Sequence, residues 1–386
     1  MAANTYIGVN GVARKIKAIN YGVNNIARGV TKGYIGVNGI ARLFYTNAGG
    51  MGTLEHSAAT PLSLSRYSLA ATTIGNHALL GGGSVGTGSY SSTVDAYDNQ
   101  ILRTKAPSLS TARAGLAATA VGDYALFGGG ANGSSAFNIV DVYNNELTLT
   151  AGTPFSLKRN SLAATSVGKY ALFGGGNTTQ YYDSANTAAD VTVYNSEKEQ
   201  LAAPSLSTAR ARLAATAVGD YALFGGGANG TNYYNIVEAY SDDLTRLTIT
   251  PLYDRAADLA ATTIGNHALF GGGRNTAPVN YITVYDESLT QQRLNSSLYN
   301  YGAFFLAAAT VGNFAIFGGG NINSNSYTNY VSYFDQELTR TEGDRLQVGR
   351  SRLAATAVGD YALFGGGLSS STNTESAVDA YKFITD

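Results

Sequence analysis

The chain of 386 residues contains no cysteine and no tryptophan, and only 13% of its residues are charged. Without cysteine it cannot form disulfides, thiolate metal sites or a cysteine nucleophile. Its net charge is −1, whereas a nucleic-acid-binding protein is expected to carry an excess of basic residues. No apolar run approaches the roughly 18 residues of a membrane-spanning helix, and the N-terminus lacks the charged and apolar segments of a secretory signal. We therefore expect no nucleic-acid partner, no membrane insertion and no secretion signal.

One sequence, LAATAVGDYALFGGG, recurs with small changes along most of the chain. A period of about 47 residues indicates a repeat architecture. Features common to all copies are expected to be scaffold, whereas features that differ between copies are candidates for function. The copies begin at Leu69, Leu116, Leu162, Leu213, Leu259, Leu306 and Leu353.

The second copy shows how one period is expected to fold. Two short runs, 116–121 and 124–130, flank Gly122-Asp123, and glycine followed by a polar residue is typical of a tight hairpin turn. A third run, FNIVDVY at 137–143, and a fourth, ELTLT at 146–150, complete the period. Four short antiparallel strands per repeat are typical of a propeller blade. The sequence therefore predicts an all-β, seven-bladed β-propeller whose small, alanine-rich first strands lie nearest the axis.

These blocks resemble the kelch repeat, in which an arginine precedes the first strand, a double glycine closes the second and a tyrosine lies in the third. Two departures are the missing tryptophan of the fourth strand and the irregular fifth and sixth copies, where Arg255 comes one position early and Ala303 replaces the arginine. The resemblance implies the architecture and says little about function. The arginines are Arg66, Arg113, Arg159, Arg210 and Arg350, and the tyrosines are Tyr97, Tyr143, Tyr194, Tyr240, Tyr285, Tyr333 and Tyr381.

The last copy is too short for four strands, because only KFITD follows Tyr381. Residues 52–68, which precede the first copy, contain an LSLSR motif similar to the APSLSTAR stretch before the second and fourth copies. We expect residues 52–64 to supply the outer strand of the last blade, which closes the ring and leaves no open edge.

The N-terminal residues carry a different repeat, with YIGVNGVAR at Tyr6, YGVNNIAR at Tyr21 and YIGVNGIAR at Tyr34. Asn-Gly between β-forming residues predicts hairpins, with Val9 opposite Val12 and Ile7 opposite Arg14. Such hairpins build little core alone, so we expect either an attachment region (1–47), joined by a linker (48–52) to the propeller (53–386), or a flexible leader. The expected attachment residues are Tyr6, Val9, Val12, Tyr21, Ile26, Tyr34, Val37 and Ile40.

The hairpin repeat resembles short segments of structural and tail-associated proteins of bacteriophages and prophages. This resemblance implies a virion component, assembled in the host cytoplasm, that binds other virion proteins through its N-terminal region and carries a distal propeller. A homo-oligomer is a further arrangement that the sequence leaves open.

No constellation typical of an enzyme is visible in the sequence. His77 and His267 replace a repeated tyrosine beside the hairpin turn, and His56 lies in the expected closing strand without a partner cluster. The GGG runs lack the Lys-Ser/Thr and helix of a phosphate loop. The sequence therefore predicts no catalytic activity, no cofactor and no metal. Acidic residues recur in the third strand, where we expect hydrogen-bonded structural roles: Asp95, Asp141, Glu238 and Asp379.

The segments after each GGG differ between copies and are rich in tyrosine, asparagine, serine and glycine. Tyrosine offers a large amphipathic contact area and asparagine offers adaptable hydrogen bonds, so these loops are candidates for recognition of a glycan or a protein. Phe137, Tyr234 and Tyr327 also lie in these segments. For these three, packing at the start of the third strand is as good an interpretation as ligand recognition. The candidate ligand-binding residues are Tyr90, Asn132, Tyr181, Tyr182, Asn229, Tyr233, Asn275, Tyr281, Asn321 and Tyr330.

Three functions remain open from the sequence. The first is a host-surface binding protein of a phage or phage-like particle, with the variable propeller face as its binding surface. The second is a decoration, collar or baseplate subunit whose propeller binds other virion proteins. The third is a cellular kelch-type scaffold.

Overall fold

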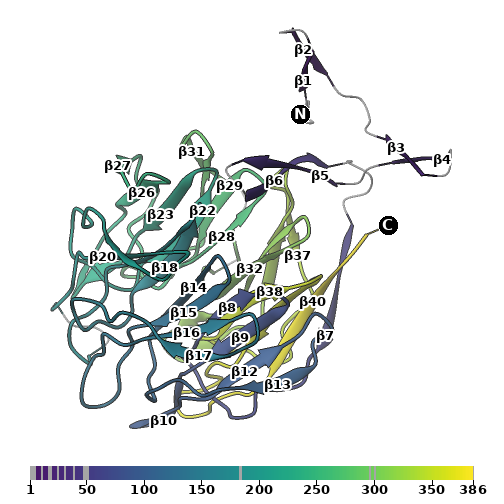
Figure 1. Cartoon of the computed structure of the whole chain (residues 1–386). Coiled ribbons are helices and arrows are strands. Elements are labelled where there is room, and N and C mark those ends of the chain that lie inside the picture. The colour runs from purple at the N-terminus through teal and green to yellow at the C-terminus, as the bar shows by residue number, and fades with distance from the viewer. Residues whose placement is uncertain are drawn as a thin grey trace. The chain divides into compact units, whose positions relative to one another are not determined.

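The computed structural model describes residues 6–9, 12–15, 20–23, 26–29, 32–37, 40–46, 52–181, 185–294, 297–299 and 301–385. It divides into two compact units, Met1–Thr53 with Thr385–Asp386, and Leu54–Ile384. The regular elements of the described residues are all strands (Figure 1). Among these residues there is no helix long and apolar enough to span a membrane.

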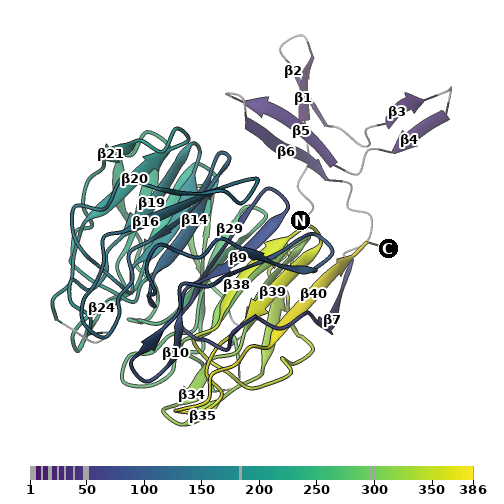
Figure 2. The same cartoon turned by 60° about the horizontal axis from the view of Figure 1, so that its bottom comes forward.

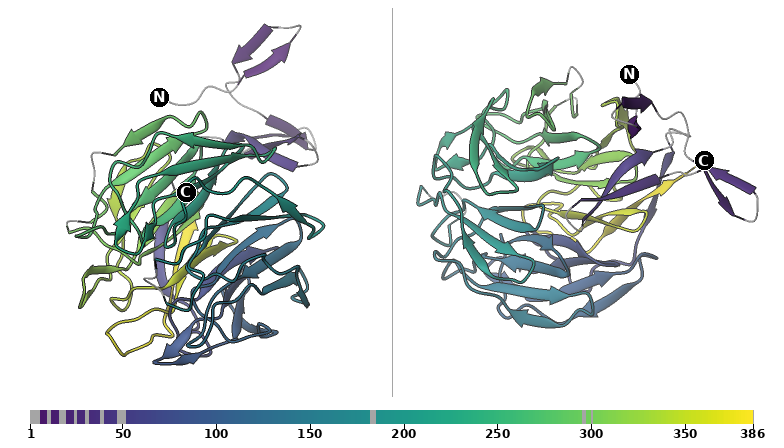
Figure 3. Two further views of the ribbon diagram at one scale, coloured as in Figure 1. Left: turned by 90° about the vertical axis from the view of Figure 1, so that its left-hand side faces the viewer. Right: turned by 45° about the horizontal axis from the view of Figure 1, so that its top comes forward.

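The larger unit contains seven four-stranded antiparallel sheets, which confirms the predicted all-β, seven-bladed propeller. The sheets follow one another in chain order around the unit (Figure 3). The first six are β8 (Ala70–Ile74), β9 (His77–Gly81), β12 (Val94–Tyr97), β13 (Arg103–Ala106); β14 (Ala117–Val121), β15 (Tyr124–Gly128), β16 (Val140–Asn144), β17 (Leu149–Ala151); β18 (Ala163–Val167), β19 (Tyr170–Gly174), β20 (Val191–Asn195), β21 (Gln200–Ala202); β22 (Ala214–Val218), β23 (Tyr221–Gly225), β26 (Val237–Ser241), β27 (Arg246–Ile249); β28 (Ala260–Ile264), β29 (His267–Gly271), β30 (Ile282–Asp286), β31 (Gln291–Arg293); and β32 (Ala307–Val311), β33 (Phe314–Gly318), β36 (Val331–Phe334), β37 (Arg340–Glu342).

The seventh blade is composite, as the sequence predicts. Its order is β38 (Ala354–Val358), β39 (Tyr361–Gly365), β40 (Val378–Ile384) and β7 (Thr53–Ala58). Strand β7 comes from the beginning of the unit and lies beside β40 at its end (Figures 1 and 2). The ring is therefore closed by hydrogen bonds between the two ends of the unit, and the last blade has no missing strand.

The first strands of neighbouring blades contact one another around the axis. Their alanine and threonine side chains are small enough to be crowded there, and threonine hydroxyls link neighbouring blades, as in the 2.8 Å Oγ1–Oγ1 contact between Thr216 and Thr263. Between blades, larger side chains fill the core. In the second blade, Phe127 meets Tyr143 edge-to-face at 5.7 Å between ring centres, a favoured geometry for aromatic pairs.

The triple glycines connect each blade to the next. At Gly129, φ is +69°, and a Cβ there would lie 2.5 Å from the carbonyl oxygen of Arg159. The N–H of Gly130 donates to that same oxygen at 2.9 Å. The equivalent bond from Gly367 to Arg66, also 2.9 Å, connects the last blade to the first. The glycines are required because the chains approach too closely for a side chain.

The repeated arginines are buried ion-pair partners of the third-strand carboxylates. Arg113 is 0% exposed, and its Nη1 lies 2.9 Å from Asp141 Oδ2. Asp141 also accepts the backbone N–H of Ser110 at 3.2 Å. The recurrent acids are therefore structural in these blades, as expected, and do not form a solvent-facing ring. The equivalent pairs are Arg66–Asp95, Arg210–Glu238 and Arg350–Asp379.

The third blade keeps the arginine without the carboxylate. Arg159 donates to the hydroxyl of Thr192 and to the carbonyl oxygens of Gly175 and Asp190. Burial lowers the pKa of Arg159 to about 10, and the attraction of Asp190 opposes this shift. Carbonyl and hydroxyl dipoles therefore replace the ion pair in this blade.

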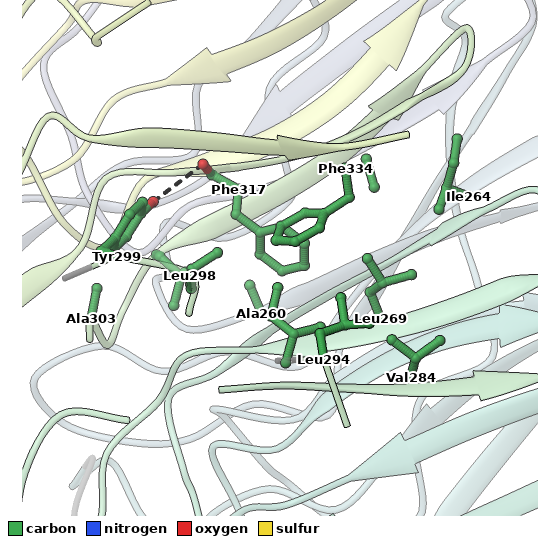
Figure 4. Packing of buried hydrophobic residues seen from close by; sticks show 13 residues of the cluster. Ala260, Ile264, Leu269, Val284, Leu294, Leu298, Tyr299, Ala303, Phe317 and Phe334 are labelled. Carbon is green, nitrogen blue, oxygen red and sulfur yellow. Dashed lines mark hydrogen bonds between the residues drawn. The ribbon is translucent and has the colours of Figure 1, made fainter. Parts of the chain in front are cut away.

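The sixth blade differs from the prediction at the repeated tyrosine, and it replaces the repeated arginine by another residue. Tyr333 is not at the repeated tyrosine position, because Phe334 pairs with Ala315 as Tyr143 pairs with Ala125. Where this blade lacks the arginine, Tyr299 is buried, and its hydroxyl donates to the Phe317 carbonyl at 3.2 Å (Figure 4). This carbonyl is equivalent to Phe127 O, which accepts from Arg113. Tyrosine thus supplies the hydrogen bond that arginine makes in other blades.

The N-terminal unit contains three hairpins, made by β1 (Tyr6–Val9) with β2 (Val12–Lys15), β3 (Asn20–Val23) with β4 (Ile26–Gly29), and β5 (Lys32–Val37) with β6 (Ile40–Thr46). The predicted register of the first hairpin is confirmed, with Ile7 opposite Arg14 and Val9 opposite Val12. The expected attachment residues lie in these strands, and the turns between the strands of each pair lie outside the described residues.

Candidate functional site

A ring of backbone hydrogen bonds surrounds a hollow of about 190 Å³ at the axis, called the mouth below. It is formed by the residue that precedes the first leucine of each repeat. Each of these residues has φ between +52° and +64°. Each N–H donates to the carbonyl of the equivalent residue in the preceding blade at 2.7–2.9 Å, and the bond from Ser68 to Arg352 closes the circle. The seven residues, called the mouth ring below, are Ser68, Gly115, Ser161, Arg212, Asp258, Phe305 and Arg352.

The side chains of the mouth ring are unevenly distributed. Blades one to three contribute serine, glycine and serine, whereas blades four to seven contribute Arg212, Asp258, Phe305 and Arg352. The ring bonds use only backbone atoms, so the scaffold does not dictate which side chain projects from each position. A non-glycine residue in this left-handed conformation costs about 1–2 kcal/mol. Large side chains are therefore present on one side of the mouth despite a backbone that favours glycine.

Charged and aromatic side chains contact one another on that side. Asp258 Oδ2 accepts from Arg212 Nη1 at 3.3 Å and from Arg274 Nε at 2.9 Å. The Cζ atom of Arg352 lies 4.3 Å from the centre of the Phe305 ring, and that of Arg274 lies 5.3 Å from the same ring. Cations over aromatic faces are attracted by the ring quadrupole. The contacts hold the guanidinium groups in defined positions.

A cleft of about 600 Å³ opens beside these residues, between the loops of blades five, six and seven. Arg274, Phe304, Phe305 and Arg352 form its charged and aromatic part. Its polar part includes Asn321 and residues of the small hairpin β34 (Asn321–Asn323) and β35 (Ser326–Tyr327). The residues that line the cleft include two arginines and no carboxylate.

Two more hollows adjoin this cleft. A hollow of about 900 Å³ contains Tyr233 and shares Asn275 and Thr276 with the cleft. A smaller one, of about 150 Å³, contains Tyr90 and Asn132 and shares Arg352 with it. Two further hairpins shape these hollows: β24 (Ala228–Asn229) with β25 (Asn232–Tyr233), and β10 (Ser84–Gly86) with β11 (Ser89–Tyr90). Five predicted residues are thus gathered on one face: Tyr90, Asn132, Tyr233, Asn275 and Asn321.

Some asparagines among the predicted residues also shape their own loops. Asn132 Oδ1 accepts the N–H groups of Ser134 and Ser135. Asn275 Nδ2 donates to Arg255 O at 3.2 Å, and its Oδ1 accepts from Ala277 N. These amides fix the loop conformation, so their contribution to a ligand is partly indirect.

Four of the other predicted residues, Tyr181, Asn229, Tyr281 and Tyr330, do not line the three hollows. Tyr281 has the guanidinium of Arg293, at the end of the outer strand β31, 3.5 Å from the centre of its ring. Tyr330 packs on Tyr299 and under Arg345, which follows β37. Asn229 donates to Ala209 O. Tyr181 is 67% exposed, and Tyr182 lies outside the described residues.

The histidines are distributed over separate places. His77 and His267 begin β9 and β29 opposite Ile74 and Ile264. His56 on β7 lies 2.7 Å from Asp379 Oδ1 in the closing blade. Within the described part of the chain, no group of three or more histidine and acidic side chains is arranged to hold a metal ion.

No family model and no curated protein matches the chain. Solved structures do match, among them one described as "Structure of YjhT". The similarity has a TM-score of 0.56 at 12% sequence identity, and it covers 83% of this chain and 96% of that one. At this identity the similarity shows the fold, a β-propeller, which agrees with the seven sheets.

This similarity corrects the prediction that the chain is not an enzyme. The prediction rested on the absence of a recognisable catalytic motif, but the chain shares its fold with YjhT at low sequence identity. A propeller carries binding and catalytic sites alike, and those sites are built from variable residues. Missing motifs are therefore not sufficient to exclude catalysis.

Sequence reasoning missed the most distinctive residues of the face, namely Arg212, Asp258, Arg274, Phe305 and Arg352. The signal was present in the repeats. The residue before each first leucine and the residue after each GGG change from copy to copy, and only the fifth copy carries arginine directly after GGG. The importance of these positions depends on the axial geometry, which brings residues of different repeats together.

Proposed function

We propose that the propeller recognises a host-surface glycan or protein through the face that carries the mouth ring and the three hollows. The observation that carries the proposal is the adjacency of the hollows, which share residues and are lined by the loops that vary most between repeats. Clefts with aromatic walls and a few polar groups are the usual form of ligand sites.

The proposal includes a phage or phage-like particle as the setting, with the N-terminal hairpins as the attachment region. Its support is the repeated GVN hairpin sequence and its resemblance to tail-associated proteins, together with the division of the chain into two units. The kelch-like assignment of the propeller is likewise a proposal, supported by the buried arginine of the repeat. In this setting, the proposed partners of the hairpins are other virion proteins.

A binding experiment tests the recognition step. The full chain is labelled and applied to an array of purified glycans and to bacterial cell envelopes. We expect Tyr233→Ala and Asn275→Ala to weaken binding at least tenfold without lowering the melting temperature by more than a few degrees. Tyr124→Ala is the matched control, because Tyr124 begins β15 at the opposite end of the strands. Equal binding by all three variants would refute the proposed face.

Location in purified particles tests the setting. Electron microscopy with an antibody against the propeller should place it at an exposed, distal position. An interlocked position among other subunits would instead support the decoration, collar or baseplate function. Absence from particles would support the cellular scaffold.

A further inference from the structure

The mouth and the cleft together carry an excess of positive charge. Their lining residues include Arg212, Arg274 and Arg352, and a single carboxylate, Asp258. The full chain has a net charge of −1, so this local excess is not a reflection of a basic protein. Charge of one sign and low-dielectric walls together concentrate the electric field in a cleft.

The repeats provide an internal comparison for this charge. At the mouth-ring position, blades one to three carry serine or glycine with the same backbone hydrogen bonds. At the position after GGG, Arg274 is equivalent to Ser84, Ala131, Asn177, Ala228, Asn321 and Leu368, and all seven bridge to the segment before their first strand. The backbone bonds of the repeat therefore form without arginine at either position. Arg274 and Arg352 are not required by these bonds, and both line one cleft.

The aromatic residues are placed to support a ligand beside these charges. Phe305 lies under Arg352 and near Arg274, and Phe304 lies 5.0 Å from the Arg274 Cζ. Guanidinium groups match the geometry of carboxylate and other oxyanions, with two parallel N–H donors. Asn275 and Asn321 also line the cleft, where their amide nitrogens donate to the carbonyls of Arg255 and Asn323 and so fix the shape of its polar wall.

We propose that the cleft binds an oxyanion group of a hydroxylated organic ligand between Arg274 and Arg352. The group is a carboxylate, sulfate or phosphate, and the body of the ligand packs on Phe304 and Phe305. Asp258 acts as a positioning residue, since its carboxylate holds Arg274 and Arg212. The inference rests on the proposed function only in that the ligand approaches the same face.

Titration of the full chain with glucuronate, inorganic sulfate and inorganic phosphate tests the site. Binding is followed by calorimetry and by the melting temperature, at ionic strength held constant with chloride. We expect saturable binding of at least one probe. Glucose is the neutral control, and if the bound group is a carboxylate, glucuronate should bind at least tenfold more tightly than glucose. Tighter sulfate or phosphate would identify the other oxyanions.

The variants use residues that the repeat itself carries at the same positions, so that the fold is retained. Arg352→Ser copies Ser68 and Ser161, and Arg274→Asn copies Asn177 and Asn321. Each should weaken probe binding at least tenfold, whereas Arg345→Gln, on an exposed arginine elsewhere, should not. No saturable binding by the wild type, or equal binding by all variants, would overturn the inference.

The two proposals fail separately. If the probes do not bind but glycans or envelopes do, and Tyr233→Ala weakens that binding, the face is a recognition surface and the oxyanion site is wrong. If the probes bind through Arg274 and Arg352 but no surface ligand is found, the oxyanion site stands and the host-recognition function is wrong.

Discussion

His56 Nε2 lies 2.7 Å from Asp379 Oδ1, and this contact joins two residues that are 323 positions apart in the chain. His56 is on β7 and Asp379 is on β40, the two strands that close the ring. Asp379 is buried, and its carboxylate also accepts hydrogen bonds from Arg350 Nη2 and from the backbone N–H of Gln347. The Asp379 carboxylate on β40 thus connects the closing strand β7 to the segment that leads from the sixth blade into the seventh.

The first prediction concerns acid stability. Burial raises the pKa of Asp379, but the hydrogen bond from His56 and the attraction of Arg350 outweigh it, so the pKa lies below its ordinary value. A carboxyl group with a lowered pKa stabilises the fold above its unfolded pKa, and that contribution is lost as pH falls through the folded pKa. His56→Ala removes one cause of the lowering, so the acid-unfolding midpoint should move to higher pH.

Circular dichroism between pH 7 and pH 2 measures this midpoint. Glu55→Ala, an exposed neighbour on the same strand, is the control and should unfold at the wild-type pH. If His56→Ala and the wild type share one acid midpoint, the pairing does not stabilise the closing blade.

The second prediction concerns closure itself. A chain that begins at residue 65 loses β7 together with Leu62, which is buried, and Leu54, which packs against the core. Burial of one fully and one partly buried leucine contributes about 4 kcal/mol, so the melting temperature of a propeller of this length should fall by about 5 °C or more. A chain that begins at residue 52 retains β7 and is the control. Equal melting temperatures of these two chains would show that β7 is dispensable.

The architecture could be predicted because its causes are local and repeated. Glycines at fixed offsets, a two-residue turn and a small first strand occur in every copy, so each copy supports the same interpretation. The origin of the outer strand of the last blade could also be predicted, because the LSLSR motif before the first copy has counterparts elsewhere in the chain.

The sixth blade and the binding face could not be predicted in the same way. The tyrosine series of the repeat predicts Tyr333 for the third strand, yet the strand register decides the position, and Phe334 pairs with Ala315. Tyr281 and Tyr330 lie in segments with the composition of recognition loops, but their rings pack against Arg293 and Arg345 of their own blades. Arg274 and Arg352 belong to different repeats, and the arrangement of the blades around the axis brings them to one cleft.

The third prediction compares two blades. Asp141 pairs with buried Arg113, whereas the third blade has Thr192 in the equivalent place beside Arg159. Asp141→Val should cost about 3–5 kcal/mol, because it leaves a buried cation without its acceptor. Asp141→Thr copies the third blade, and its hydroxyl should recover about 1 kcal/mol or more of that loss.

Chemical denaturation of the wild type and both variants measures these differences. Valine and threonine have nearly the same shape, so the contrast between them isolates the acceptor. Equal stability of the two variants would show that the hydroxyl does not replace the carboxylate, and a neutral Asp141→Val would show that Arg113 does not depend on the ion pair.

The fourth prediction concerns the close approach of neighbouring blades. Gly129→Ala places a methyl group 2.5 Å from the Arg159 carbonyl, at a φ of +69°. The left-handed conformation costs about 1–2 kcal/mol, and displacing the backbone of the next blade adds about 1–3 kcal/mol. Gly88→Ala separates the two effects, because Gly88 has a φ of +73° and open space around its Cβ. Denaturant titration should therefore show a larger loss for Gly129→Ala than for Gly88→Ala. Losses of the same size would mean that backbone conformation alone, and not contact between blades, requires glycine in the repeat.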